Sequence, residues 1–152
     1  MATASTPRAT IDDLYRVKEK AELIGGKIVR LMPTGHAPNQ VAGTIYVELF
    51  TLVKRTGRGF AYTDNMSFVV PELPSGRESF SPDVAYFDGP VPGGWMRFVS
   101  GAPTFAVEVR SEGDYGPRAE REMAAKRADY FAAGTRVVWD VDPEAELIHV
   151  YR

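Results

Sequence analysis

The sequence predicts an α+β fold in which a mixed β-sheet is flanked by helices. Helical and strand patterns interleave along the 152 residues without an internal repeat, and no low-complexity tract or linker interrupts them. A strongly apolar strand at 104–110 precedes a well-delimited helix at 117–133, and two further strands close the chain. This length fits a single domain, expected over residues 10–152 after a flexible N-terminus at 1–9.

Capping and turn residues set the elements of the N-terminal half. Thr10, with Asp13 three residues later, marks a helix start. Gly25-Gly26 between two short apolar runs predicts a hairpin, and Gly57 ends a run with helical spacing. The expected elements are a helix over 10–21, strands over 22–24 and 27–31, a loop over 33–39, a helix over 40–56, and strands over 60–63 and 66–70.

Proline and glycine divide the C-terminal half in the same way. Pro117 suits the first position of a helix, and Gly134 suits its C-cap. The expected elements are a loop over 71–81, a strand over 83–87, a loop over 88–103, a strand over 104–110, a helix over 117–133, and strands over 136–141 and 147–151.

Composition excludes several classes of function. The chain contains no Cys and only two His, which argues against disulfides, thiol catalysis and a zinc site. Its 18 basic and 20 acidic residues give a net charge of -2, unlike a nucleic-acid coat or a polybasic membrane anchor. Because no signal peptide or membrane-length apolar run is visible, we expect a cytoplasmic protein.

Glu108 is the most informative polar residue. Strand alternation places it with Ala106 on one face, opposite Val107 and Val109. A carboxylate within so apolar a strand is costly to bury unless it is paired or binds a metal. The simpler interpretation is an exposed ion pair with Arg110, and the strand alone does not decide between the two.

Asp83 opens the preceding strand after Pro82, where a plain turn residue is the alternative. Two carboxylates on neighbouring strands repel, so they tend to hold a proton or share a cation. An oxygen-only ligand set favours Mg²⁺ or Mn²⁺.

Lys126 shares a helix face with Met123 and Tyr130 rather than with the charged residues. It could simply extend to solvent along apolar neighbours, or it could direct its ammonium at the two acids and stabilise charge on a phosphate. Two acids and a nearby cation are what metal-assisted phosphodiester hydrolysis requires.

At these residues the chain resembles the Uma-type restriction endonuclease family, within the PD-(D/E)XK nuclease superfamily. The resemblance covers most of residues 10–151. It rests on Glu22-Leu23-Ile24-x-Gly26-Lys27, Met32-Pro33, Ser81-Pro82-Asp83-Val84, Pro103 to Ser111, Lys126-x-x-x-Tyr130-x-x-x-Gly134, and Val138-Trp139-x-Val141-Asp142-Pro143.

The resemblance implies a restriction-endonuclease-like core, a bent sheet flanked by helices, and a Mg²⁺-dependent nuclease site. Asp83 and Glu108 would then be metal-binding acids, with Glu22 a third and more distant one. The superfamily's lysine, two residues after the second acid, is replaced here by Arg110, and Lys126 matches the lysine that this family carries on the following helix. Arg110 could assist Lys126, or it could neutralise Glu108 and inactivate the site. His36 is displaced by two residues from the family's usual histidine.

The expected function is Mg²⁺-dependent hydrolysis of DNA phosphodiester bonds. Two alternatives stay open: a catalytically idle nuclease-like fold acting as a binding or dimerisation module, and a metal-dependent phosphoesterase on a small substrate. Because one small domain cuts both strands most simply as a symmetric pair, we expect a homodimer.

Overall fold

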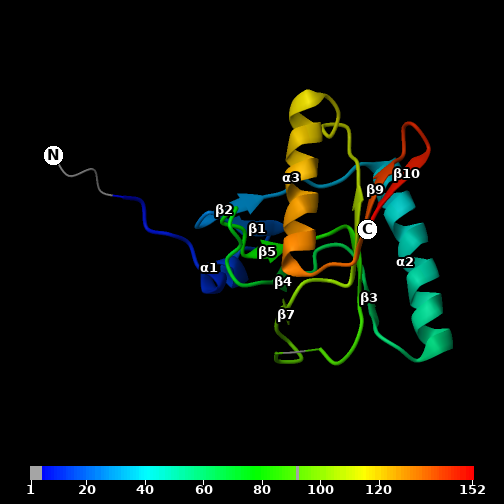
Figure 1. The fold of residues 1–152 in the computed structure, drawn as a ribbon, viewed down its shortest axis with the longest axis horizontal. Coiled ribbons are helices and arrows are strands. Elements are labelled where there is room, and N and C mark those ends of the chain that lie inside the picture. Colours follow the sequence, from blue (N-terminus) through cyan, green and yellow to red (C-terminus); the bar gives the residue numbers. More distant parts are fainter. Residues whose placement is uncertain (1–4, 92) are drawn as a thin grey trace.

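The computed structural model describes residues 5–91 and 93–152, and its elements follow one another as drawn in Figure 1. The helices are α1 (Ile11–Arg16), α2 (His36–Thr56) and α3 (Pro117–Ala133). The strands are β1 (Ala21–Ile24), β2 (Lys27–Arg30), β3 (Phe60–Tyr62), β4 (Phe68–Val69), β5 (Ser79–Phe80), β6 (Val84–Phe87), β7 (Val99–Ser100), β8 (Phe105–Val109), β9 (Val137–Asp142) and β10 (Leu147–Tyr151).

The strands form three sheets, and the largest has the order β10-β9-β8-β6-β3. Its strands are antiparallel except for β8 and β9, which run parallel. A parallel pair needs a crossover connection, and α3 supplies it between these two strands. A three-stranded sheet, β5-β4-β7, and the hairpin β1-β2 complete the fold. The predicted α+β class with a mixed sheet is confirmed.

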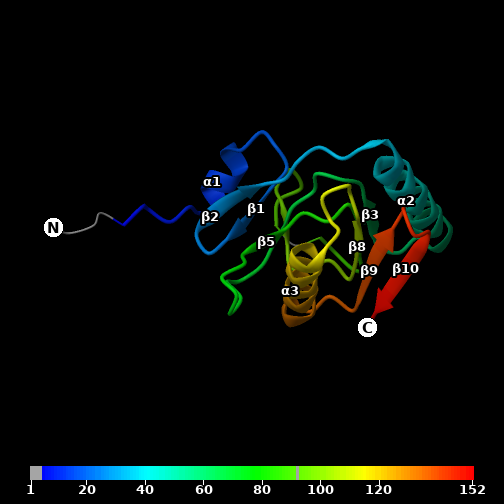
Figure 2. The ribbon, with the colours of Figure 1, turned by 90° about the horizontal axis from the view of Figure 1, so that it is seen from above.

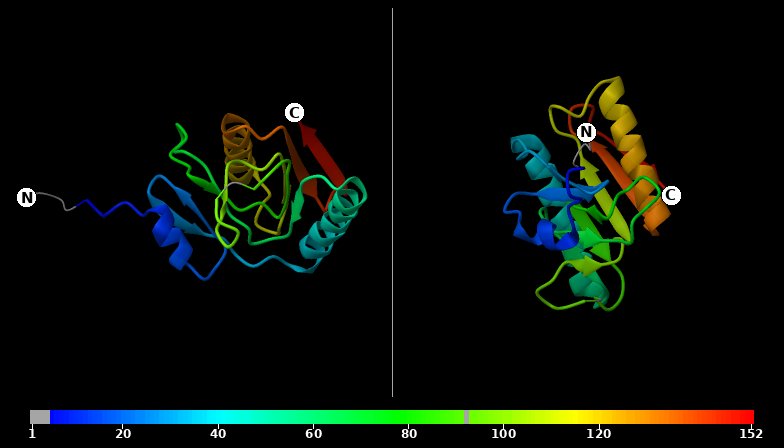
Figure 3. Two further views of the ribbon diagram at one scale, coloured as in Figure 1. Left: turned by 90° about the horizontal axis from the view of Figure 1, so that it is seen from below. Right: turned by 90° about the vertical axis from the view of Figure 1, so that its left-hand side faces the viewer.

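Two apolar layers hold helices against the opposite faces of the large sheet (Figures 2 and 3). On one face, α2 packs on a cluster that contains Val84, Val107 and Val141. On the other face, Tyr130 of α3 joins a cluster that also includes Phe80 of the small sheet. Alternating residues of β8 therefore enter different layers, and Glu108 faces α3.

Several predicted boundaries are confirmed by the capping residues. Thr10 and Asp13 form the expected capping box at α1. Gly57 and Gly134 end α2 and α3 in the left-handed conformation, with φ of 67° and 106°. The range 117–133 for α3 was predicted correctly.

Other boundaries differ from the prediction. The first helix ends at Arg16 rather than near Ala21, because Ala21 already belongs to β1. The second begins at His36 rather than Gln40, since Pro38 lies in the first turn, where a helix needs no N–H donor. The two-residue strands β5 and β7 lie in segments predicted as loops, because runs so short carry no alternation.

The N-terminal segment makes contacts as far as it is described. Residues 1–4 of the predicted flexible terminus lie outside the described residues. Beyond them, the Ala9 N–H donates to the Gly26 carbonyl at 2.8 Å, and Arg8 forms an ion pair with Glu72 at 3.0 Å. Among the described helices, none combines the length and hydropathy needed to cross a membrane.

The stacked pair of Phe80 and Tyr130 gives a test of the core. Phe80 is fully buried, and its ring lies 4.2 Å from that of Tyr130. We expect Phe80→Ala to lower the free energy of unfolding by about 3–5 kcal/mol, because it removes buried contacts and leaves a cavity. Urea titration at pH 7 measures the change. Phe50→Ala is the matched control, since that ring is 42% exposed and the expected loss is about 1 kcal/mol or less. Equal losses in the two variants would contradict this packing.

Candidate active site

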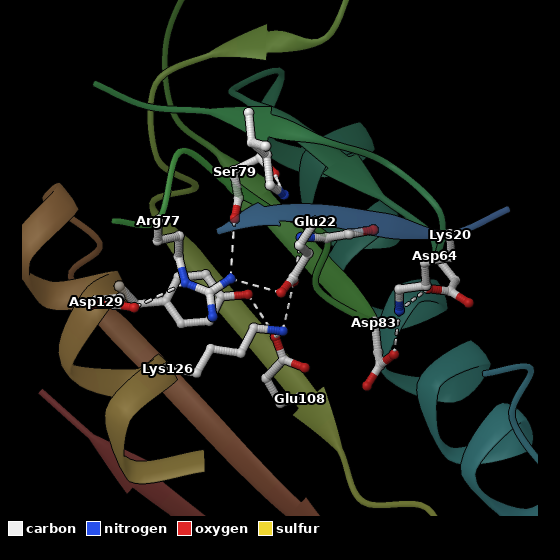
Figure 4. Close-up of polar contacts among 12 residues, drawn as sticks. Lys20, Glu22, Asp64, Arg77, Ser79, Asp83, Glu108, Lys126 and Asp129 are labelled. Atoms are coloured by element: carbon white, nitrogen blue, oxygen red, sulfur yellow. Dashed lines mark hydrogen bonds and ion pairs between the residues drawn. The ribbon is translucent and has the colours of Figure 1, made fainter. Parts of the chain in front are cut away.

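A cavity of about 610 Å³ lies between the hairpin β1-β2, the start of β6, the end of β8 and one face of α3. Four of the six residues singled out in the sequence line it: Glu22 from β1, Asp83 ahead of β6, Glu108 from β8 and Lys126 from α3. Figure 4 shows these side chains converging from separate elements. The fold therefore assembles the predicted site from segments up to about a hundred residues apart.

Strand register explains why Asp83 and Glu108 approach each other. β6 and β8 pair antiparallel, with Val84 opposite Val107. Continuing this register by one residue places Asp83 opposite Glu108, and directly opposed residues point to the same face of a sheet. The hydrogen bond from the Asp83 N–H to the Val107 carbonyl, 3.0 Å, keeps the strands paired at this point.

Glu108 is held at its position by two donors from α3. The Tyr130 hydroxyl donates to Oε1 at 2.6 Å, and Lys126 Nζ lies 2.8 Å from the same oxygen. Burial raises the pKa of Glu108, the ammonium of Lys126 opposes that effect, and the charges of Asp83 and Glu22 add to it. The net direction is upward, which is the behaviour expected of a carboxylate facing others of its kind.

Lys126 bridges two carboxylates. Its Nζ lies 2.8 Å from Glu22 Oε1 and 2.8 Å from Glu108 Oε1. Burial alone would lower the pKa of Lys126, but the charges of Glu108 and Glu22 outweigh it and the pKa is raised. The side chain does not extend to solvent along its apolar neighbours, so the ammonium is a fixed positive charge inside the cavity.

Glu22 is the second carboxylate that pairs with Lys126. Its side chain is only 3% exposed and accepts from Arg77 at 2.7 Å and from the Ser81 N–H at 2.9 Å. Burial would raise the pKa of Glu22, but Lys126 and Arg77 more than offset it and hold the pKa at about 2. Glu22 is therefore a permanent anion between two cations.

Asp83 has its own cation. Lys20, immediately before β1, places Nζ 2.9 Å from Asp83 Oδ1 and also contacts Asp64. The other oxygen of Asp83 accepts from the Val109 N–H at 2.7 Å. Each of the two facing carboxylates thus has a separate ammonium, Lys20 for Asp83 and Lys126 for Glu108.

Sequence reasoning missed five members of this network: Lys20, Asp64, Arg77, Asp129 and Tyr130 as a donor. Arg77 is 6% exposed, joins Glu22 to Asp129 of α3, and lies over the Phe80 ring. It stands in a segment rich in Gly, Ser and Pro that carries no periodicity, so nothing local distinguished it from a surface loop arginine. Only its burial in the folded structure identifies Arg77 as a member of the network.

The donor set suits a hard divalent cation but not a three-carboxylate cage. Asp83 and Glu108 offer oxygen ligands on adjacent strands, and Glu108 Oε2 accepts no hydrogen bond from any described residue. Within the described part of the chain, no three His, Asp, Glu or Cys residues lie close enough together to hold a metal. Glu22 is engaged here by Lys126, Arg77 and Ser81, and its role as the third, more distant ligand that the resemblance implies stays a prediction.

Comparison with known families is decisive at this point. Residues 9–152 match the family described as "Putative restriction endonuclease", Uma2. The chain belongs to the Uma2 family. No curated protein matches the sequence. The fold is similar to that of a crystal structure from Anabaena variabilis described as "a putative nuclease belonging to DUF820", with a TM-score of 0.70 and 22% identity over 94% of this chain and 79% of that one.

Arg110 lies outside the network of this Uma2 chain. Its guanidinium binds Asp140 of β9 through two hydrogen bonds, of 2.8 and 2.7 Å, and contacts Glu120 of α3. The Glu108–Arg110 ion pair considered from the sequence is not formed. Arg110 pairs instead with Asp140 on β9 and Glu120 on α3. Arg110 therefore neither neutralises Glu108 nor contacts Lys126, and instead it fastens the start of α3 to the sheet.

His36 is likewise separate from the site. It is the first residue of α2, is exposed, and does not line the cavity. The structure thus brings together Glu22, Asp83, Glu108 and Lys126, and leaves Arg110 and His36 apart.

The depressed pKa of Glu22 predicts a pH effect on stability. A carboxylate whose pKa falls from 4.5 to about 2 on folding stabilises the protein above pH 4.5, and this contribution is lost as pH falls from about 4.5 to about 2. Over the whole window it amounts to about 3 kcal/mol, of which about 2 kcal/mol is lost by pH 3. Between pH 7 and pH 3, wild type should therefore lose about 2 kcal/mol more than Glu22→Gln.

Urea unfolding of both proteins at the two pH values measures this difference. At pH 7 the variant itself should be less stable by about 3–5 kcal/mol, because Lys126 and Arg77 lose their shared anion. Glu72→Gln is the control, since that carboxylate is exposed and among the described residues forms an ion pair with Arg8 alone. Parallel pH profiles for wild type and Glu22→Gln would contradict the buried ion network.

Proposed function

We propose that this protein is a Mg²⁺-dependent nuclease that hydrolyses phosphodiester bonds in DNA. The observation that carries the proposal is the convergence of Asp83 and Glu108 from adjacent strands with the buried ammonium of Lys126 in one cavity. Membership of the family described as "Putative restriction endonuclease" supports it, as does a fold similar to that of a protein described as "a putative nuclease".

Asp83 and Glu108 are the residues that would hold the metal, and Mn²⁺ could replace Mg²⁺ on the same oxygen ligands. A bound divalent cation supplies two things at such a site: it lowers the pKa of water and offsets negative charge on a phosphate. The raised pKa of Glu108 fits this role, because a second cation relieves its repulsion with Asp83.

The chain's own residues supply positioning and charge. Lys126 stays protonated and directs a fixed ammonium beside Glu108, where charge on a phosphate oxygen would be stabilised. Glu22 and Arg77 keep that ammonium in place, and the Tyr130 hydroxyl fixes the rotamer of Glu108. Arg110 has no direct role in this arrangement, because its contacts are with Asp140 and Glu120.

Removing either carboxylate or the lysine should abolish cleavage. We expect Asp83→Asn, Glu108→Gln and Lys126→Met each to lower the rate of plasmid cleavage in Mg²⁺ or Mn²⁺ by about a hundredfold or more, since each is asked to supply a few kcal/mol to the transition state. A supercoiled-plasmid nicking assay with and without EDTA measures it.

Glu72→Gln is the activity control, because its exposed carboxylate lies outside the cavity. Circular dichroism and a melting curve for each variant separate lost catalysis from lost folding. Metal-dependent cleavage that persists in Asp83→Asn or Glu108→Gln would refute this assignment.

The charge of the cavity limits how the substrate binds. Three cations line it, and each already contacts a carboxylate: Lys20, Arg77 and Lys126. Seven carboxylates line the same cavity: Glu22, Asp64, Asp83, Glu108, Asp114, Glu122 and Asp129. Among the described residues, this cavity therefore lacks a row of unpaired cations that could contact successive phosphates of DNA.

Salt dependence of DNA binding tests this point. Each phosphate neutralised by Lys or Arg contributes about −0.9 to the slope of log K against log salt. With at most three cations, all paired, we expect a slope of about −3 or shallower in fluorescence anisotropy with catalytically inactive Asp83→Asn. A slope near that of a protein with ten phosphate contacts would place the binding surface elsewhere.

The same acidic lining favours a second candidate, a metal-dependent phosphoesterase acting on a small substrate. A nucleotide phosphodiester presents one or two charges, and so suffers less repulsion than a polymer. Hydrolysis of bis(p-nitrophenyl) phosphate with no cleavage of DNA would support that candidate over the nuclease. The third candidate, a catalytically idle module, was suggested by Arg110 beside Glu108, by the weakly acidic net charge and by the displaced His36. Because Arg110 pairs with Asp140 and Glu120, the first of these three reasons does not apply.

A further inference from the structure

The outer edge of β10 is an unprotected sheet edge. β10 ends the five-stranded sheet, and no described strand pairs with its outer side. Natural sheets protect such edges with Lys, Pro, bulges or covering segments. The strand reads Leu-Ile-His-Val-Tyr and contains none of those residues. Figure 3 shows it as the red arrow at the rim of the fold.

The strand is also apolar and exposed. Leu147, Ile148 and Val150 are 53%, 49% and 48% exposed; Ile148 and Val150 lie on one face of the strand and Leu147 lies on the other. Ile148 and Val150 lie opposite Val141 and Trp139 of β9, on the face that α2 covers further along the sheet. The exposed side chains of Ile148 and Val150 therefore form an apolar strip at the sheet edge, next to the apolar residues of β9 that α2 covers.

We propose that β10 pairs with β10 of a second copy of this chain, antiparallel about a two-fold axis at His149. Pairing of this kind satisfies the free N–H and C=O groups of both edges at once and joins the two sheets into a continuous one. It is also self-complementary, as a two-fold dimer requires. In this register Ile148 of one copy lies opposite Val150 of the other, which extends the apolar strip across the axis.

Charge at the ends of the strand selects this arrangement. Glu146 precedes β10 and Arg152 follows it. The antiparallel register centred on His149 places Glu146 of each copy beside Arg152 of the other. A parallel arrangement would instead bring like charges together at both ends, which is unfavourable for directly opposed residues.

The proposed interface is distant from the candidate active site. β10 contributes no residue to the cavity around Asp83 and Glu108. The pairing strands therefore occupy neither cavity, and assembly can be tested whether or not the protein cleaves DNA.

The first test is the oligomeric state of the whole chain. Light scattering and sedimentation at about 50 µM should show a dimer for wild type. Ile148→Glu and Val150→Glu should each raise the dissociation constant by about a hundredfold or more, because each buries a carboxylate opposite an apolar side chain of the partner, where no cation pairs with it. Met96→Glu is the matched control, since that side chain is 89% exposed on a loop away from the sheet edge. Circular dichroism confirms that each variant is folded.

The second test fixes the register and uses the absence of Cys from the chain. Directly opposed residues of an antiparallel pair have Cα atoms about 4.5–5.5 Å apart, within the range that a disulfide spans. His149→Cys should therefore form a covalent dimer on mild oxidation, whereas Met96→Cys should not. A monomeric wild type, or equal crosslinking of the two variants, would overturn the proposal.

Discussion

The bridge that Lys126 forms between Glu22 and Glu108 is the interaction on which the candidate site depends. A lone ammonium or carboxylate in so enclosed a position would be costly, and each of these three groups is tolerable only because the others are present. Removal of one leaves a buried charge without its partner. The bridge also ties β1, β8 and α3 together, three elements that share no backbone pairing with one another.

The connectivity of the fold makes this bridge possible. α3 is the crossover between the parallel strands β8 and β9, so it must lie across the face of the sheet that carries Glu108. Arg110 reinforces that placement by binding Asp140 of β9 and Glu120 near the start of α3. Arg110 therefore contributes to the candidate site indirectly, by holding the helix that carries Lys126.

The sequence predicted those parts of the site that depend on local pattern. The alternation of side chains along 104–110, with a period of two residues, predicted the sheet face on which Glu108 lies. The helix limits at Pro117 and Gly134, with a period of 3.6 residues between them, predicted the helix face on which Lys126 lies. The ion-pair partners of Arg110 could not be predicted this way. It depends on which of several nearby acids reaches the guanidinium, and that is settled by the pairing of β8 with β9 and by the position of α3.

The same limit explains why Arg77 and Lys20 were missed. Both lie in short connections, where neither amphipathic spacing nor capping chemistry identifies a buried residue. Likewise β5 and β7, with two residues each, form because Phe68, Phe80 and Val99 of the small sheet pack into the core. Long-range contact, and not local preference, determines these elements.

The charges of the network give a reason for a divalent cation that does not depend on resemblance. The ion pairs form two neighbouring groups: Lys20 with Asp64 and Asp83, and Lys126 and Arg77 with Glu22, Glu108 and Asp129. Together they contain five carboxylates and three cations. Fully ionised, they carry a formal charge of −2. The protein can reduce this excess by keeping a proton on Glu108, which is the direction in which its pKa is shifted, or by binding one divalent cation. Because the second route leaves Glu108 ionised and Lys126 paired, a Mg²⁺ bound at Asp83 and Glu108 would bring the network to neutrality without disturbing the bridge beneath it.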